Sequence, residues 1–514
     1  MSVVDPPQSR PPAAGHGGSQ PGSGASSHGP LARAARSPLG LALGACILLA
    51  VLSAAVLPTV PSYDPFSWIV WGREVSDPHL SFRVSGGPSW KPLPFLFTTV
   101  WGLFGGAAPT LWVITARVGG LLGLYFAWRL ARRLTGRGAL GHVAGVLAVI
   151  GIVLTLDWPY YFLRGTSEVV LIGVTLGAID RLLCGRRAQA YVLAIAAGLI
   201  RPEWWPFIGL FALYLWFRDP AWRNWQARAF ILAGLALLPF LWFVPPWVGS
   251  GDPFLAASHA ASYNGHLGAN RLRTVFARGV NLQVLPALIA AVVAVALGWW
   301  QRRDRVLLGL GAAVIAWWIV VIGMTLDGYP GLERFYLPAA AVTCVLGGIG
   351  IVRIAELAAG AAGAGGARRT AIAAAVVLVL VLVSIPLSSA RISETRAAIP
   401  AANRAVATLQ HLDRAVAAAG GHAGVFPCLS SFAAVNHGVQ TALAWKLHVT
   451  LERVGTSMRA PGVDFIGPHN ATDGAPAPVD PRLTRHEHIA EVAGWRVVRL
   501  TDPNLHRSTA CVGR

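Results

Sequence analysis

Charged residues are scarce in this sequence. They make up 13% of the 514 residues, whereas 54% of the residues are hydrophobic. A soluble protein carries roughly 25% charged residues, so the composition excludes a soluble globular enzyme. It also excludes a disordered chain, because disordered chains contain few apolar residues. The apolar excess indicates a protein that is embedded in a lipid bilayer.

Among the charged residues, acidic residues and lysine are much less frequent than arginine. The chain has 23 Asp and Glu against 42 Lys and Arg, which gives a formal net charge of +19, and its only lysines are Lys91 and Lys446. The Arg residues stand in short clusters between apolar runs, which is how multi-span membrane proteins fix their orientation. We therefore expect the positive charge to set membrane topology, and we expect no nucleic-acid partner.

Three nucleotide-binding signatures are absent. The sequence contains no Asp-x-Asp, no P-loop and no Gly-x-Gly-x-x-Gly motif. It therefore gives no support for a metal-bound sugar nucleotide, a P-loop nucleotide or a dinucleotide cofactor. The sequence assigns no certain cofactor and leaves a requirement for a divalent metal open.

Composition divides the chain into three parts. Residues 1–37 are rich in Pro, Gly and Ser and predict a disordered cytoplasmic tail. Residues 38–389 predict an all-α polytopic transmembrane domain of about eleven helices, because a fully apolar strand would leave its backbone unsatisfied in lipid. The apolar runs lie near 38–60, 110–131, 138–156, 167–184, 188–201, 204–217, 228–246, 284–300, 306–325, 335–354 and 370–388.

The loops between these runs predict the orientation. With the N-terminus inside, every second loop carries an Arg cluster, so this face is predicted to be the cytoplasmic side of a plasma membrane. The assignment requires that residues 93–106 do not span, and we interpret this short run as a helix in the outer interface. Two outer loops are long, 61–109 and 247–283. The second begins Gly-rich and predicts a mobile lid over a site.

Ionisable residues avoid the predicted bilayer centre, where Arg117 is the deepest exception. A proton-coupled transporter would place Asp, Glu or His near the midplane. Here acids, bases and aromatic residues gather at the outer rim instead. This distribution predicts an outward-facing site for a lipid-borne polar substrate whose phosphate lies among Arg and Lys.

Two candidate site residues follow the first helix. Asp64 stands just beyond it, where a carboxylate could act as general base on an acceptor hydroxyl, or cap a helix in front of Pro65. Lys91, beside Trp90, begins the predicted interfacial helix. Its ammonium could hold a phosphate or could extend to lipid head groups.

Further candidates lie in the later outer loops. Arg201 and Glu203 either pair with each other or contact substrate. Arg334, followed by Tyr336, is the best candidate for a lipid phosphate, because a guanidinium binds phosphate bidentately, although it could instead neutralise Glu333. Asp252, in Gly-Ser-Gly-Asp-Pro, could bind an acceptor or a metal, or could stabilise a turn. Glu168 is expected to cap the helix that follows it.

The remaining segment, 390–514, is polar and predicts a small extracytoplasmic α/β domain. Helical stretches at about 398–419 and 437–448 alternate with short apolar runs. Cys428 and Cys511 are its two cysteines, and a disulfide between them is one of two open alternatives. The tract Arg485-His486-Glu487-His488 is interpreted as solvated rather than as metal-binding.

The run from Trp90 to Arg137 resembles the GT-C superfamily of membrane glycosyltransferases, which use polyprenyl-phosphate sugars. It contains Lys91-Pro92-Leu93-Pro94, then Leu103-Phe104-Gly105, Ala116-Arg117 and Ala131-Arg132-Arg133-Leu134-Thr135-Gly136. The histidine common at the start of this pattern is replaced by Trp90-Lys91. Leu199-Ile200-Arg201-Pro202-Glu203 and Glu333-Arg334-Phe335-Tyr336-Leu337-Pro338 resemble two further turns of the family. The chain is also similar to a narrower actinobacterial group without a settled activity.

The resemblance covers roughly residues 38–390. It implies transfer of a sugar from a polyprenyl-phosphate donor to an extracytoplasmic glycan, lipid or protein acceptor by inverting displacement, with Asp64 as general base. It also implies that Arg334, helped by Lys91 or Arg201, holds the departing phosphate. Two alternatives remain: a transporter or flippase of lipid-linked substrates, and a non-catalytic assembly protein that has kept the fold.

Overall fold

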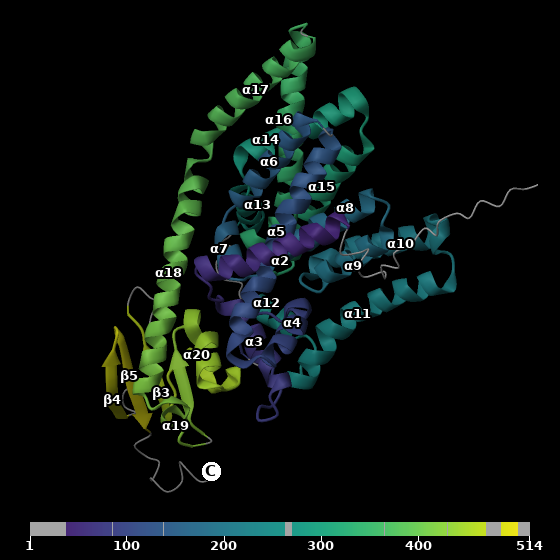
Figure 1. Ribbon diagram of the computed structural model, residues 1–514. Helices are drawn as coiled ribbons and strands as arrows, with labels where there is room; N and C mark the ends of the chain where they lie inside the picture. Colours follow the sequence, from purple (N-terminus) through teal and green to yellow (C-terminus); the bar gives the residue numbers. More distant parts are fainter. Residues whose placement is uncertain are drawn as a thin grey trace, which may run out of the picture.

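The computed structural model describes residues 37–84, 86–136, 138–262, 270–363, 365–428, 430–468 and 485–501. The described chain is mainly helical and carries a small five-stranded sheet near its C-terminal end (Figure 1). This is the predicted all-α body with an added α/β domain. The predicted tail lies almost wholly outside the described residues.

Each of the eleven apolar runs forms a helix. They are α2 (Pro38–Val56), α5 (Ala108–Thr135), α6 (Ala139–Val153), α8 (Ser167–Leu183), α9 (Arg187–Gly198), α10 (Trp205–Arg218), α11 (Trp225–Ser250), α14 (Leu285–Leu297), α15 (Arg305–Leu326), α16 (Leu337–Ala361) and α17 (Gly366–Leu387). Short elements join them: α7 (Trp158–Leu163), η2 (Pro202–Trp204), η3 (Pro220–Trp222), η4 (Gly298–Arg302) and η5 (Glu333–Tyr336).

Not all of the eleven helices in the described residues are long enough to cross a membrane by themselves. Among the described residues, six helices are long and apolar enough to cross a membrane, and a seventh span results if the bent pair Arg271–Leu282 and Leu285–Trp300 is counted as one. The difference arises from short helices such as α9, with 12 residues, and α10, with 14, because a span needs about 20 residues. The chain is a multi-pass membrane protein.

Helix α16 forms the centre of the helical body. Of the residues in its membrane-length apolar segment, 94% are buried. The helix packs against α14, α6 and α5. Glycines make this packing close: a Cβ atom at Gly350 would overlap the carbonyl oxygen of Ala290, and one at Gly348 would overlap that of Ala144. Small residues at helix contacts allow backbones to approach in this way.

The predicted outer loop 61–109 is folded rather than open. It forms α3 (Tyr63–Ser76), α4 (Pro92–Gly102) and η1 (Gly105–Ala107). Helix α4 has 11 residues and is too short to span a membrane. Trp68, Trp71 and Trp90 are fully buried between these elements, and Gly72 packs directly on the backbone of Thr98. The loop residues therefore form a rigid platform.

The predicted lid at 247–283 is also largely helical. Helix α11 continues to Ser250, and α12 (Leu255–Ser262) and α13 (Arg271–Leu282) follow, with 263–269 outside the described residues. The hydroxyl of Ser89 donates to the carbonyl of Ala256 at 3.1 Å. Helix α12 is therefore tied to the segment that precedes α4.

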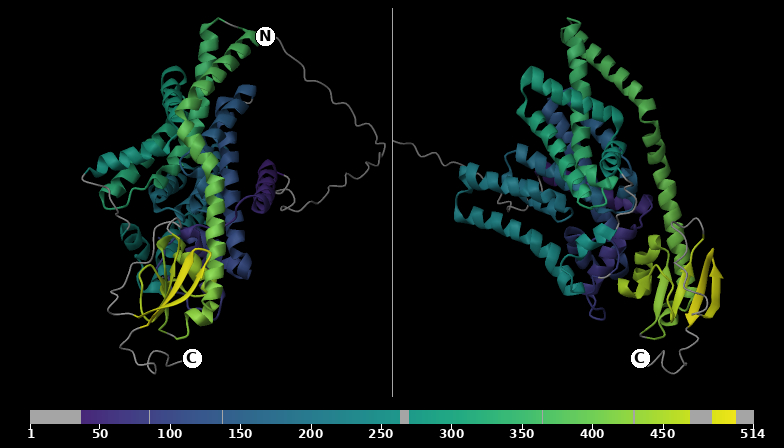
Figure 2. Two further views of the ribbon diagram at one scale, coloured as in Figure 1. Left: turned by 90° about the vertical axis from the view of Figure 1, so that its left-hand side faces the viewer. Right: turned by 180° about the vertical axis from the view of Figure 1, so that it is seen from behind.

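The C-terminal domain begins with α18 (Ser389–Ala418), which starts nine residues before the predicted helix. Together α17 and α18 run from one end of the molecule to the sheet at the other end, and the α10–α11 pair projects on the opposite side (Figures 1 and 2). The remaining elements are α19 (Gly421–Val425), η6 (His437–Val439), α20 (Gln440–Leu447), η7 (Leu451–Arg453) and strands β1 (Phe432–Val435), β2 (Val454–Gly455), β3 (Gly462–Ile466), β4 (Arg485–Val492) and β5 (Trp495–Thr501).

The sheet has the strand order β2-β1-β3-β5-β4. Strand β1 is parallel to β2 and β3, whereas β5 is antiparallel to β3 and β4. The predicted α/β character of this domain is thus confirmed. Cys428 is disulfide-bonded, and Cys511, the partner considered in the sequence, lies outside the described residues.

The C-terminal domain packs on α3. Arg73 is buried, and its guanidinium donates to the carbonyl oxygens of Trp445 and Val449, each at 3.0 Å, and of Ala444 at 3.3 Å. These carbonyls belong to the last turn of α20 and the residues after it, which lack helical partners. One side chain therefore joins the platform to the C-terminal domain.

Candidate functional site

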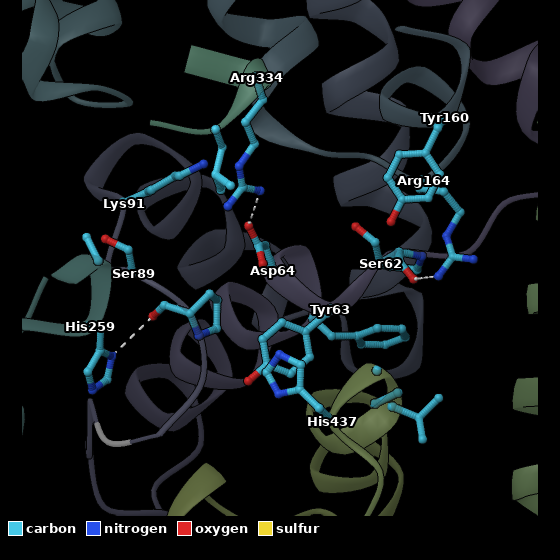
Figure 3. Close-up of a pocket in the computed structure, with 18 of the residues that line it drawn as sticks. Ser62, Tyr63, Asp64, Ser89, Lys91, Tyr160, Arg164, His259, Arg334 and His437 are labelled. Atoms are coloured by element: carbon cyan, nitrogen blue, oxygen red, sulfur yellow. Dashed lines mark hydrogen bonds and ion pairs between the residues drawn. The ribbon is translucent and has the colours of Figure 1, made fainter. Parts of the chain in front are cut away.

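A cavity of about 580 Å³ lies where this domain meets the helical body. Figure 3 shows Asp64 near its middle, with Lys91 and Arg334 on one side. The lining residues from the helical body include Ser62, Tyr63, Asp64, Ser89, Lys91, Tyr160, Arg164, Arg201, His259, Tyr329 and Arg334. Those from the C-terminal domain include Ala401, Ala402, Arg404, Ala405, Thr408, His437 and Ala442.

Glu168 is the centre of the ion-pair network beside this cavity. It lies in the first turn of α8 and is 1% exposed. Its Oε1 atom is 2.9 Å from Arg201 Nη2 and 3.4 Å from Lys91 Nζ. The sequence suggested only a helix-capping role for Glu168. The sequence signal for this larger role was an acid at the start of a helix, on the same predicted membrane face as three cations.

Lys91 is held in a desolvated position. Its ammonium donates to Ser167 Oγ at 2.8 Å and lies 5.1 Å from the ring centre of Trp68. Burial lowers the pKa of Lys91 to about 8, and the negative charge of Glu168 opposes this effect. The residue thus remains mostly charged at neutral pH in a site where its field is weakly screened.

Asp64 and Arg334 form an ion pair inside the cavity. Arg334 Nη1 is 3.0 Å from Asp64 Oδ2 and 4.0 Å from Glu168 Oε1. Helix α3 begins after Ser62, so Asp64 lies within its first turn and its carboxylate points to Arg334 rather than capping the helix. Glu333 Oε1 is 3.6 Å from Arg278 Nε. Arg334 therefore does not neutralise its neighbour Glu333, which pairs with Arg278, and pairs with Asp64 instead.

Arg201 and Glu203 also pair with each other. Arg201 Nη1 is 3.5 Å from Glu203 Oε1, and both side chains are buried. The Arg201 guanidinium lies 4.2 Å from the ring centre of Phe335. Arg201 lines the cavity, whereas Glu203 lies behind it. Three cations and three carboxylates thus meet at one side of the cavity.

Three of the sequence candidates lie elsewhere. Trp90 is buried and donates from Nε1 to the carbonyl of Leu241 at 3.0 Å. Tyr336 is buried and donates to the carbonyl of Val275 at 3.2 Å. Asp252 is a turn residue whose Oδ1 accepts from the Phe254 amide at 2.8 Å. These three side chains fix the packing around the cavity but do not line it.

The C-terminal wall of the cavity was missed by the sequence analysis. The ring of His437 packs against that of Tyr63 at a tilt of 44°, with ring centres 4.2 Å apart, and Thr441 donates to the carbonyl of Tyr63 at 2.9 Å. Helix α18 contributes three alanines together with Arg404, Thr408 and Leu409. Such a wall leaves no local pattern in the sequence, because its residues are ordinary members of amphipathic helices.

Within the described ranges, no three His, Cys, Asp or Glu side chains come close enough to hold a metal ion. His486 and His488 lie on the edge strand β4, far along the chain from the cavity residues. The sequence left a metal requirement open, and these ranges contain no preformed metal-binding cluster that would decide it.

The sequence matches no protein-family profile and no curated protein. Solved structures that are similar to it include two of one protein. One is ArnT from Cupriavidus metallidurans bound to undecaprenyl phosphate, with 14% identity and a TM-score of 0.49 over 93% of this chain and 100% of that chain. The other is the same protein in the apo state, with 14% identity and a TM-score of 0.46 over 89% of this chain and 98% of that chain.

Proposed function

We propose that this protein is a GT-C-like membrane glycosyltransferase that moves a sugar from a polyprenyl-phosphate donor to an extracytoplasmic acceptor. The observation that carries the proposal is the juxtaposition of Asp64 with Lys91, Arg201 and Arg334 around one cavity. Cations suit the phosphate of a lipid carrier, and a carboxylate beside them suits proton abstraction from a hydroxyl. In this proposal the cavity and the C-terminal domain face outward.

The reaction is a displacement at the anomeric carbon of the donor sugar. The acceptor oxygen forms the new bond on one face while the bond to the phosphate oxygen breaks on the other, so the configuration inverts. The electron pair of the broken bond leaves with the polyprenyl phosphate, and Asp64 takes the proton of the acceptor hydroxyl. Arg334 and Lys91 stabilise the charge on the departing phosphate.

The ion pair of Asp64 with Arg334 connects donor binding to base activity. Arg334 Nη1 lies 3.0 Å from Asp64 Oδ2, so the guanidinium occupies a carboxylate oxygen that would receive the proton of the acceptor. A donor phosphate competes for the same guanidinium. Donor binding therefore frees the carboxylate of Asp64 for the acceptor hydroxyl, and the donor binds first.

The test uses purified protein in lipid nanodiscs, a panel of radiolabelled polyprenyl-phosphate sugars and a panel of hydroxylated acceptors that includes glycans, lipids and peptides. Donor binding and sugar release are measured separately for the wild type, Asp64→Asn and Asp327→Asn. Asp327 is exposed and does not line the cavity, so its variant is the matched control. We expect the wild type and Asp327→Asn to bind and turn over one donor, and Asp64→Asn to bind it with turnover reduced by about 10²–10⁴-fold.

The alternatives give different results. A flippase would move the lipid between leaflets without releasing sugar, and would do so in Asp64→Asn as well. A non-catalytic protein would bind no donor or would bind it without turnover. Either result would overturn the proposed activity.

A further inference from the structure

The cavity has a second basic region that the proposed chemistry does not use. Figure 3 shows Arg164, Ser62 and Tyr160 on the opposite side of Asp64 from Lys91. Arg164 follows α7, and Arg404 reaches the cavity from α18. Arg164 therefore lies in the region beyond the candidate base, and Arg404, from an element far away in the sequence, lines the same cavity.

These arginines differ from the cations near Glu168 in their charge balance. Lys91, Arg201 and Arg334 each pair with a carboxylate. In contrast, neither Arg164 nor Arg404 has an ion-pair partner within the described part of the chain. At these two arginines the cavity thus carries positive charge that no ion pair among the described residues compensates.

Arg164 also has an unused hydrogen-bond donor. Its Nη2 donates to the carbonyl of Pro61 at 3.0 Å, which fixes the guanidinium at the cavity wall. Its Nε is buried without a hydrogen-bond partner. Because Nε has almost no accessible surface, it does not face the cavity. The Nη1 atom has no acceptor among the described residues and retains accessible surface, so Nη1 is the nitrogen that is open to a ligand.

The wall formed by α18 has small side chains and leaves space in the cavity. Helix α18 presents Ala401, Ala402 and Ala405 to the cavity, together with the hydroxyl-bearing Thr408. A volume of about 580 Å³ is in the range of pockets that hold small organic ligands, roughly 300–1,000 Å³. The cavity thus has room for an acceptor group beside a donor sugar.

We propose that Arg164 and Arg404 bind an anionic group of the acceptor, a phosphate or a carboxylate, while a hydroxyl of the same molecule reaches Asp64. This inference rests on the proposed function, because it assigns the acceptor side of the same cavity. It names the acceptor class as a hydroxylated molecule that carries phosphate or carboxylate. The donor phosphate and the acceptor anion are then held on opposite sides of the base, which keeps like charges apart.

The test measures equilibrium binding in phosphatidylcholine nanodiscs, with and without saturating undecaprenyl phosphate. The probes are glycerol 3-phosphate, glycerate and neutral glycerol, which separate the phosphate arm from the carboxylate arm. We expect at least one anionic probe to bind the wild type, and glycerol to bind at least 10-fold more weakly than that probe. Arg164→Gln and Arg404→Gln should each weaken the anion by at least 10-fold, whereas Arg164→Lys should retain most of the affinity.

The control is Arg396→Gln, on an exposed position of α18 that does not line the cavity. It should bind the probes as the wild type does, and all variants should retain wild-type affinity for undecaprenyl phosphate. The inference is overturned if no anionic probe binds, or if Arg164→Gln and Arg404→Gln bind the anions as tightly as the wild type. If undecaprenyl phosphate itself does not bind, the proposed function fails, and the titration without that lipid still decides the role of Arg164 and Arg404.

Discussion

Arg334 and Asp64 face each other across the cavity as an ion pair, with 3.0 Å between Nη1 and Oδ2. Arg334 comes from η5, which precedes the most buried helix of the body, and Asp64 comes from α3 on the platform. The candidate phosphate ligand and the candidate base are thus held by two independently anchored elements. This arrangement makes the contribution of each residue separable by experiment.

Replacing Arg334 by Gln should weaken donor binding. A charge-assisted hydrogen bond contributes about 1.5–3 kcal/mol, so we expect an affinity for undecaprenyl phosphate that is lower by about 10–150-fold. Isothermal titration in nanodiscs measures the effect. Arg368→Gln, which changes an exposed Arg outside the cavity, serves as the control. Unchanged affinity in Arg334→Gln would remove Arg334 from the phosphate site.

Lys91 should make donor binding depend on pH. Burial lowers its pKa to about 8, so the free protein loses the Lys91 charge as the pH rises through about 8. A bound phosphate favours the charged form, so affinity is full below pH 8 and falls above it. The phosphodiester of a polyprenyl-phosphate sugar keeps one negative charge throughout this range, so the change in affinity comes from Lys91. Titrations between pH 7 and 9.5 should show the fall in the wild type.

Lys91→Arg provides the matched comparison for that profile. An arginine keeps its charge throughout this range, so the affinity of the variant should change little between pH 7 and 9.5. A wild-type affinity that stays constant over the same range would contradict the assignment of Lys91 to the phosphate.

Glu168→Gln should lower the thermal stability of the protein and make that stability depend on a bound anion. Without this carboxylate, the buried Lys91 and Arg201 repel each other, and breaking such a buried pair costs about 3–5 kcal/mol. Thermal unfolding should therefore show a lower Tm for Glu168→Gln than for Glu487→Gln, which changes an exposed position on β4. Undecaprenyl phosphate should raise the Tm of Glu168→Gln more than that of the wild type. An equal rise in both would show that the lipid phosphate lies away from Glu168.

Arg73→Met should loosen the C-terminal domain while leaving the helical body folded. The variant keeps the aliphatic stem but removes three hydrogen bonds to carbonyls around the end of α20. We expect faster hydrogen exchange in residues 440–449 and sugar transfer reduced by at least 10-fold, because the cavity loses one wall. Arg83→Met, at an exposed position outside the cavity, is the control. Unchanged exchange in 440–449 would show that other contacts suffice to hold the domain.

The sequence analysis predicted the helices well because hydrophobic runs are a local signal. It also placed Asp64, Lys91, Arg201 and Arg334 on one face, since loop charges report topology. The exact number of spans was not predictable, because a run of 12–15 apolar residues has the same local pattern whether or not it crosses the bilayer. The wall made by the C-terminal domain was not predictable. Arg73 and Trp445 are 372 residues apart, and no local pattern connects them.

The role of Glu168 was missed for a similar reason. A single acid at a helix start is typical of capping, and only the three-dimensional arrangement shows that Lys91, Arg201 and Arg334 converge on it. Conversely, Asp252 and Tyr336 have functional groups that suit a binding site, but Asp252 stabilises a turn and Tyr336 is buried against Val275. Residue type and predicted face therefore identified the cations of the site, but not the carboxylate that organises them.

The position of α18 and α20 at the cavity has a consequence for the order in which the protein matures. Ribosomes produce the platform and the membrane helices first, and the segment that supplies Arg404 and His437 emerges after all of them. Until that segment folds back onto α3, the nascent protein has the candidate base and the cations but an open side. The complete cavity is therefore formed only after α18 and α20 have been synthesised.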